Sequence, residues 1–352
     1  MAPKYAKDQP VGFTNRIEQV AIVGASGQIG THLATALVKT GKHTVTALTR
    51  LGSENKVPPG VKAVSVDYDN ESSVISALKG QQILIITLSG FAPPDAHSKI
   101  VQAAAKAGVP HIMPNIFGIN DANEALIREN LLSPDIKGIT AEIKAAGLSY
   151  TYLICSLWYE YSLAMGPLWF GFDFPNKKLT LYDDGTTKVN LTTFEQCGRA
   201  VAAWLSLKEL PEDANDTSLT VDSWRNKPLV ISSFLVSQLD MFESWKRITG
   251  DKDSDWTIEK VPSKERYQQG IEAMKNAQDP MSGRMGAAMA SFVRIFYPNG
   301  DGDYESTRGL DNGQLGLPKE DLDGCTAVAK QMVDDGYAAK VMAKVGGTQP
   351  TL

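Results

Sequence analysis

Three glycines near the N-terminus have the spacing of a dinucleotide-binding turn. Residues 19–31 run from an apolar strand through Gly24, Gly27 and Gly30 into an amphipathic helix. Backbone N–H groups at the start of such a helix bind a pyrophosphate only where no side chain keeps it away. A glycine-rich turn without a ligand is the alternative, but the strand before and the helix after it favour binding. The residues predicted to hold the phosphates are Gly24, Ser26, Gly27, Gln28, Ile29 and Gly30.

A basic residue stands where an NAD-binding protein would carry an acid. A second strand, residues 43–49, is followed by Arg50, twenty positions after Gly30. An acid here would hold the ribose 2′-hydroxyl, whereas a guanidinium offers paired donors to a 2′-phosphate. Lys56 in the following loop would add a second positive charge. A solvated residue at a strand end is the alternative for Arg50; the cofactor that we predict is NADP(H).

The elements that must position these residues alternate between helix and strand. Gly41, Gly80, Gly108 and Gly147 each end a helical segment, and a short apolar strand follows each one. This alternation predicts an α/β fold with right-handed crossovers, a Rossmann-type doubly wound parallel sheet. Ligands bind outside the carboxyl ends of such strands, so the loops there should border the cofactor. They add Ser89, Gly90, Asn115 and Phe117 on the nicotinamide side, and Asp67 and Tyr68 near the adenine. A solvated turn is the alternative for Asp67 and Tyr68.

Aromatic residues gather directly after the last of these strands. Seven of them lie between Trp158 and Phe174, in a chain that is 8% aromatic. Their spacing does not keep to one helical stripe, and a pocket wall for a flat apolar substrate would explain them. Filling the core between lobe and sheet, or making a subunit contact, is an equally weighted alternative for each residue. The substrate-binding candidates are Trp158, Tyr159, Trp169 and Phe170.

The chain divides at the change in texture after residue 155. We predict an N-terminal arm (1–16), an NADP-binding Rossmann domain (17–155), and a smaller C-terminal α+β substrate lobe (156–345), from which some segments return to the sheet. A flexible tail would follow (346–352). Within the lobe, Ser232 to Gly250 has the pattern of one capped amphipathic helix. Residues 279–316 are rich in Gly, Met, Asp and Asn, which favours a mobile lid or a partner surface.

Composition excludes several classes of function. The 352 residues are 43% hydrophobic and carry a net charge of −5, and no block of lysines and arginines is long enough to bind nucleic acid. The three cysteines lie far apart without histidines at ligand spacing, so we expect no metal site. No apolar run has the length of a membrane span and none resembles a signal peptide. The expectation is a cytoplasmic monomer or homodimer without nucleic-acid or membrane partners.

Several stretches together resemble a known family. They are residues 23–30 with the glycine turn, Thr49-Arg50, residues 108–118 with Pro-Asn-Ile-Phe-Gly, and residues 145–152 with Gly-Leu-Ser-Tyr-Thr. The chain resembles the NmrA-like and isoflavone-reductase-like atypical short-chain dehydrogenases, most closely the fungal isoflavone-reductase-like oxidoreductases. The resemblance implies an NADPH-dependent reductase of a small aromatic or conjugated compound of secondary metabolism.

The same resemblance supplies a catalytic candidate. No tyrosine is followed four residues later by lysine, so the usual Tyr-x-x-x-Lys mechanism is excluded. Isoflavone-reductase-like proteins carry a lysine near the start of the helix before the Tyr-Thr strand, and Lys137 is the nearest equivalent, about one residue out of register. An ammonium there would stabilise or protonate the anion that forms on hydride transfer. A surface lysine on a helix is the alternative.

Two other functions remain open at this stage. Regulatory NmrA-like proteins bind NADP without turning over a substrate, and the imperfect register of Lys137 fits that reading. The aromatic-rich lobe argues against it, because a sensor has no evident need for one. An isomerase or cyclase on the same fold would use the cofactor without net reduction.

Overall fold

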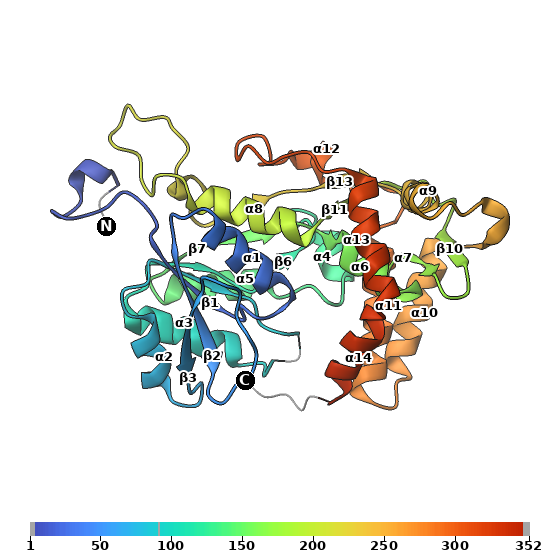
Figure 1. Cartoon of the computed structure of the whole chain (residues 1–352), viewed down its shortest axis with the longest axis horizontal. Helices are drawn as coiled ribbons and strands as arrows, with labels where there is room; N and C mark the ends of the chain where they lie inside the picture. The colour runs from blue at the N-terminus through green and yellow to red at the C-terminus, as the bar shows by residue number, and fades with distance from the viewer. Residues whose placement is uncertain (1–3, 91, 348–352) are drawn as a thin grey trace.

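The computed structural model describes residues 4–90 and 92–347. A large parallel sheet forms one half of it, and the lobe helices extend to one side of this sheet (Figure 1). The strand order is β3-β2-β1-β4-β5-β7-β12, with β6 paired to β7 outside this path, and every one of these pairs is parallel. The order reverses between β1 and β4, which is the switch point of a doubly wound sheet. The predicted Rossmann-type fold is confirmed. The strands are β1 (Gln19–Val23), β2 (Thr44–Arg50), β3 (Lys62–Val66), β4 (Ile83–Ile86), β5 (His111–Met113), β6 (Phe117–Gly118), β7 (Ser149–Ile154) and β12 (Lys227–Val230).

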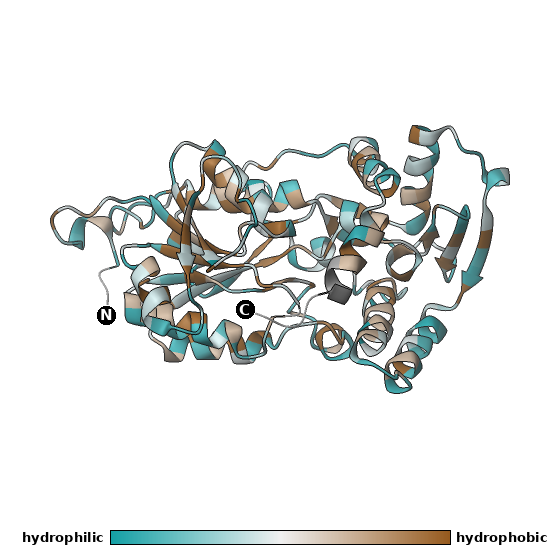
Figure 2. Cartoon of the chain, turned by 60° about the horizontal axis from the view of Figure 1, so that its bottom comes forward, coloured by the Kyte–Doolittle hydropathy of each residue, from teal (hydrophilic) through white to brown (hydrophobic). Residues whose placement is uncertain are grey.

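Helices cover both faces of this sheet. One face packs against α1 (Gln28–Lys39) and α8 (Phe194–Leu205), which bury Leu33, Leu37 and Trp204. The other packs against α2 (Glu71–Leu78), α3 (Ala96–Ala107) and α5 (Ile136–Ala145). Every residue of β4 is buried, as expected for a central strand between two helical layers. Figure 2 shows the hydrophobic residues along the central strands, between helices whose outer faces are hydrophilic.

Part of the C-terminal half returns to the sheet. Helix α8 packs on α1, and the chain then passes through the 3-10 helix η2 (Val221–Trp224) into β12 at the sheet edge beyond β7. Residues 194–230 therefore pack with the large parallel sheet and its helices, which we call the nucleotide half after the predicted NADP-binding domain (17–155), although they follow the first lobe segments in sequence.

The lobe has its own core and two small sheets. β10 lies between β9 and β14, and β11 lies between β8 and β13. These strands and the surrounding helices enclose a cluster that includes Phe170, Phe172, Phe242 and Phe296. The lobe strands are β8 (Leu157–Trp158), β9 (Phe172–Asp173), β10 (Lys178–Tyr182), β11 (Val189–Thr192), β13 (Phe234–Val236) and β14 (Thr257–Val261). The lobe helices are α4 (Glu124–Glu129), α6 (Tyr159–Ala164), α7 (Pro167–Phe170), α9 (Gln238–Thr249), α10 (Ser263–Lys275), α11 (Pro280–Arg294), α12 (Tyr304–Arg308), α13 (Leu322–Asp334) and α14 (Tyr337–Gly347), with the 3-10 helix η3 (Asp253–Asp255). A further 3-10 helix, η1 (Ala6–Asp8), lies near the N-terminus.

Two predicted boundaries in the C-terminal part of the chain differ from the structure. The helix expected from Ser232 starts later, because β13 comes first and the Ser237 hydroxyl caps α9 by accepting the N–H of Asp240 at 3.1 Å. Residues 279–316 contain α11 and α12, and the expectation that they form a mobile lid or a partner surface stays a prediction. Helix α14 continues to Gly347, so 346–347 are helical rather than part of a flexible tail, and residues 348–352 lie outside the described residues.

Candidate cofactor site

The glycine turn leaves no room for side chains where β1, β4 and α1 meet. Gly24 has φ +83°, and a Cβ there would lie 2.1 Å from the carbonyl oxygen of Thr87, just after β4. A Cβ on Gly30 would lie 2.1 Å from the carbonyl oxygen of Gly24. The Thr87 hydroxyl fixes this contact by donating to the Val23 carbonyl at 2.7 Å. Only glycine fits both positions, which brings the start of α1 against the sheet edge.

The start of α1 suits an anion. Gly27 is the N-cap residue and brings no side chain to the helix end, and the first turn contains no acidic residue. Ser26 and Gln28 are exposed beside this end, whereas Ile29 is 8% exposed and packs into the core, so only its backbone is available. The unshielded N–H groups and the positive end of the helix dipole fit a dinucleotide pyrophosphate.

The residues predicted for the adenosine end lie side by side. Arg50 ends β2, and Asp67 and Tyr68 follow the neighbouring strand β3. The Tyr68 hydroxyl donates to the Leu48 carbonyl at 3.1 Å. Burial raises the pKa of Tyr68, and the nearby positive charge of Arg50 opposes that rise. Lys56 is exposed in the loop after β2, so this corner presents two cationic side chains that could take a 2′-phosphate.

The loops after β4 and β5 also meet. Asn115, after β5, donates through Nδ2 to the carbonyl oxygen of Leu88, next to Ser89 and Gly90. Its backbone N–H points at Nε2 of His97, 3.5 Å away. Phe117 begins β6 and packs, half-buried, on the α1 side of the sheet. The structure thus brings these predicted nicotinamide-side residues to one edge, and it adds His97.

Thr87 belongs to the loop that the strand order places beside the glycine turn, and the structure puts it against Gly24. Three other residues near this site were not predicted from the sequence. His97 is an ordinary helix residue in the sequence, and only the fold places it beside Asn115. Arg284 and Tyr337 come from the lobe: Arg284 donates to the carbonyl of Gly90, and Tyr337 accepts a hydrogen bond from Gln28. These pairs are 194 and 309 positions apart, so no local pattern could mark them.

Lys137 does not lie in an enclosed pocket. It is the second residue of α5, its side chain is 90% exposed, and its ammonium lies 3.3 Å from the Glu124 carboxylate. The structure therefore places the predicted catalytic lysine near the carboxyl edge of the sheet, but in solvent and in an ion pair.

Most of the predicted substrate residues are core residues. Tyr159 and Phe170 are 0% exposed and Trp169 is 7% exposed, all within the lobe core. The Tyr159 hydroxyl also pairs with Thr326 at 2.6 Å. For Tyr159 and Phe170 the prediction of a pocket wall is corrected. Their rings fill the lobe core, because they pack between their own helices, α6 and α7, and the neighbouring elements of the lobe. Trp158 is half-buried, with its ring 4.8 Å from that of Phe194.

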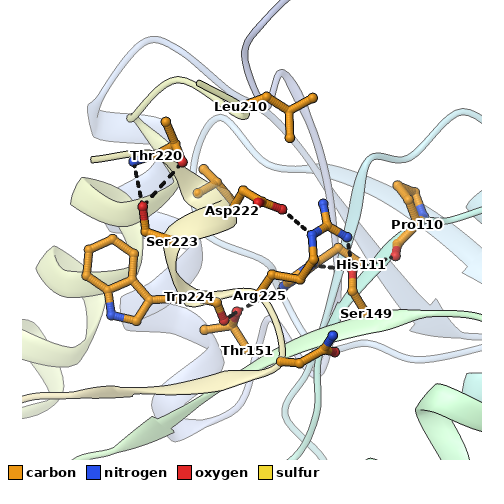
Figure 3. Close-up of polar contacts among 12 residues, drawn as sticks. Pro110, His111, Ser149, Thr151, Leu210, Thr220, Asp222, Ser223, Trp224 and Arg225 are labelled. Atoms are coloured by element: carbon orange, nitrogen blue, oxygen red, sulfur yellow. Dashed lines mark hydrogen bonds and ion pairs between the residues drawn. The ribbon is translucent and has the colours of Figure 1, made fainter. Parts of the chain in front are cut away.

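A second polar cluster lies at the opposite, amino edge of the sheet (Figure 3). Nδ1 of the buried His111 lies 2.8 Å from the Ser149 hydroxyl, and Nε2 lies 3.1 Å from that of Thr151. Arg225 donates to the Ser149 oxygen at 2.8 Å, and Thr151 donates to the Trp224 carbonyl at 2.7 Å. Burial lowers the pKa of His111 to about 3, so the ring is neutral. The cluster ties η2 to the sheet and is remote from the glycine turn.

The fold and the turn together define a Rossmann-type α/β protein whose glycine turn has the form of a dinucleotide-binding turn. The chain belongs to the NmrA-like family, whose family model matches residues 17–315. The resemblance predicted from the sequence motifs is confirmed. Within residues 4–90 and 92–347, no helix is long and apolar enough to cross a membrane, and no group of three or more His, Cys, Asp or Glu is arranged to hold a metal.

Similar proteins are reductases and oxidoreductases. Oxidoreductase aprR of Aspergillus flavus is 25% identical over 310 residues, covering 87% of this chain and 96% of that protein. Pinoresinol reductase 1 of Arabidopsis thaliana is 24% identical over 313 residues, covering 84% and 92%. The structure of AtPrR2 with NADP+ and (+)-pinoresinol has a TM-score of 0.67 at 19% identity, covering 90% of this chain and 100% of that chain. The leucoanthocyanidin reductase–NADPH complex from Vitis vinifera has a TM-score of 0.64 at 16% identity, covering 88% and 99%.

Proposed function

We propose that this protein is an NADPH-dependent reductase of a small aromatic or conjugated compound. The coarser part, an NADP(H)-dependent oxidoreductase of the isoflavone-reductase-like type, follows from its family and the oxidoreductases that it resembles. One observation of the site carries the proposal: a glycine turn closed to side chains stands at the uncapped start of α1, and Arg50 ends the adjoining strand β2.

The residues divide the work between the two ends of the cofactor. The turn would hold the pyrophosphate through backbone N–H groups, while Arg50 and Lys56 would take the 2′-phosphate. When bound, the nicotinamide supplies a hydride to an electron-poor carbon of the substrate. Asn115, held by the Leu88 carbonyl, and Phe117 would border that ring.

Lys137 is our candidate for holding the anion that forms on the reduced substrate. An ammonium beside an enolate or phenolate stabilises that charge and can return a proton to it. In the structure its partner is the Glu124 carboxylate, so the role requires the lysine to exchange this exposed ion pair for the substrate. An exposed pair of this kind contributes at most about 1 kcal/mol, which makes the exchange inexpensive.

The first experiment titrates the purified protein with NADPH and with NADH, and then follows nicotinamide absorbance as conjugated ketones, quinones and phenylpropanoids are added. We expect NADPH to bind more tightly and to be oxidised with at least one of these compounds. Binding without oxidation across the panel would favour the non-catalytic sensor or the redox-neutral enzyme. Failure to bind either cofactor would overturn the proposal.

Lys137→Ala tests the catalytic assignment separately. We expect turnover to fall at least tenfold while NADPH affinity stays unchanged, because the lysine acts on the substrate anion. Lys144→Ala, which removes an exposed lysine from the same helix, is the matched control. Equal turnover in the two variants would remove Lys137 from the mechanism.

A further inference from the structure

Two side chains of the C-terminal lobe contact the loops that border the proposed dinucleotide site. Arg284 of α11 donates through Nη1 to the carbonyl oxygen of Gly90 at 2.8 Å. Gln28 donates through Nε2 to the hydroxyl of Tyr337, the first residue of α14, at 2.7 Å. Gln28 follows β1 and Gly90 follows the neighbouring strand β4. Both contacts therefore stand over the crevice at which a Rossmann sheet binds its dinucleotide.

The Arg284 contact is close-fitting. A Cβ on Gly90 would lie 2.2 Å from Nη2 of Arg284, so the guanidinium lies directly against the backbone of the loop after β4. The first turn of α1 contains no acidic side chain to offset this charge. A guanidinium in this place adds positive charge and planar donors beside a turn already suited to phosphate.

The Tyr337 contact is held from the lobe side. Its ring meets the ring of Tyr161 edge-on, with centroids 6.1 Å apart, and Tyr161 in turn meets Trp158 edge-on at 6.1 Å. Burial raises the pKa of Tyr161 to about 12, and the positive charge of Arg284 opposes that rise. Tyr161, Arg284 and Tyr337 thus form one group with Gln28, although they come from three lobe helices and from α1.

The helix that carries Tyr337 is an addition to the part of the chain that the family model matches. That match ends at residue 315, whereas α14 spans Tyr337–Gly347. Tyr337, Ala338, Val341 and Met342 pack against the lobe core, so α14 is anchored on the lobe and meets α1 only through its first turn among the contacts described.

We propose that Arg284 and Tyr337 retain the bound dinucleotide, Arg284 through its charge beside the phosphate-binding turn and Tyr337 by joining α14 to Gln28. This inference rests on the proposed function, because it takes the crevice to be the NADP(H) site. Its consequence is kinetic: the lobe-to-turn hydrogen bonds must open before the cofactor leaves. The C-terminal helix of this chain then sets how long NADPH stays bound.

Tyr337→Phe removes the hydroxyl and keeps the ring against Tyr161. We expect the NADPH dissociation rate, followed by fluorescence as excess NADP+ displaces it, to rise about three- to tenfold, the range for one net hydrogen bond. Tyr267→Phe is the control, because its hydroxyl donates to the Glu129 carbonyl at 3.0 Å within the lobe.

Arg284→Met tests the charge. We expect the dissociation constant for NADPH to rise at least tenfold and to depend less on salt, because a cation near the phosphates is lost. Arg128→Met removes the same charge from a side chain that is 72% exposed on α4, and it should leave both quantities unchanged. Thermal unfolding of each variant checks that the fold is retained.

A double variant tests whether Gln28 and Tyr337 slow NADPH release through the hydrogen bond that joins them, or whether each side chain acts independently. Gln28→Ala with Tyr337→Phe should release NADPH about as fast as the faster of the two single variants, because each removes the same hydrogen bond. Fully additive effects, or variants that match their controls while the wild type binds NADPH, would overturn this inference alone. A wild type that binds neither NADPH nor NADP+ would overturn it together with the proposed function.

Discussion

The glycine turn and the cluster around Arg294 are both closely fitted, but the chain builds them in opposite ways. In the turn, Gly24 and Gly30 lie six positions apart and the fit depends on missing side chains. In the lobe, Arg294 is 2% exposed and donates to Glu129, 165 positions earlier, at 2.5 Å, and to Asp301 at 2.6 Å. The spacing of nearby glycines therefore predicts the turn from the sequence. The cluster around Arg294 exists only once distant segments have packed together.

The largest effect that we expect is on the lobe side of this comparison. Arg294→Met would leave the carboxylates of Glu129 and Asp301 without their shared cation in a partly buried place. Breaking such a pair typically costs about 3–5 kcal/mol of unfolding free energy, measurable by urea denaturation. Lys137→Met, which removes a side chain that is 90% exposed, should cost no more than about 0.5 kcal/mol. Similar losses in the two variants would contradict the contrast.

This difference between local and long-range contacts also explains which parts of the fold could be predicted from the sequence. Periodicity and glycine-terminated helices predict the nucleotide half well, because each strand and crossover is encoded within some thirty residues. The start of α9 was predicted too early, since the apolar residues of β13 continue the helical pattern of the residues after Ser237. Tyr159 and Phe170 could not be told from pocket residues, because burial of an aromatic ring depends on which helices fold over it.

The candidate site likewise contains residues that could be placed from the sequence and residues that could be placed only from the structure. The turn, Arg50 and the loops after β4 and β5 follow from strand order, so they could be placed at one edge from the sequence. Arg284 and Tyr337 could not, because their contacts with Gly90 and Gln28 depend on how the lobe packs on the sheet. Lys137 was chosen by resemblance of sequence position, which does not determine whether its side chain is enclosed.

A buried carboxyl at the seam between the two halves gives a pH test of intermediate size. Glu160 of α6 is 6% exposed and accepts the backbone N–H of Phe194, the first residue of α8, at 2.8 Å. Burial raises the pKa of Glu160 from 4.5 to about 7. Between these values the folded protein keeps a proton that the unfolded chain releases, so the contribution of Glu160 to stability falls as pH rises.

Glu160→Gln should remove this dependence. The unfolding free energy of the variant relative to wild type is expected to rise between pH 4.5 and pH 8, by up to roughly 3 kcal/mol. Glu124→Gln, with a side chain that is 79% exposed on α4, is the control. A constant difference between Glu160→Gln and wild type across this range would show that the pKa of Glu160 is the same in the folded protein as in the unfolded chain.

The smallest expected effect tests the nucleotide side of the comparison. Gly30→Ala places a Cβ 2.1 Å from the Gly24 carbonyl oxygen and 2.8 Å from the Thr87 hydroxyl oxygen, so the turn must move away from the sheet. Overpacking of this kind costs about 1–3 kcal/mol. Because the displaced backbone is the proposed phosphate site, we expect most of that cost in NADPH affinity, measured by fluorescence titration. Gly313→Ala meets nothing within 4 Å and should bind NADPH like wild type. Gly30→Ala could instead lower the unfolding free energy and leave NADPH affinity intact. The glycine turn would then serve only to pack α1 against the sheet, and it would not be the phosphate-binding site that its spacing predicts.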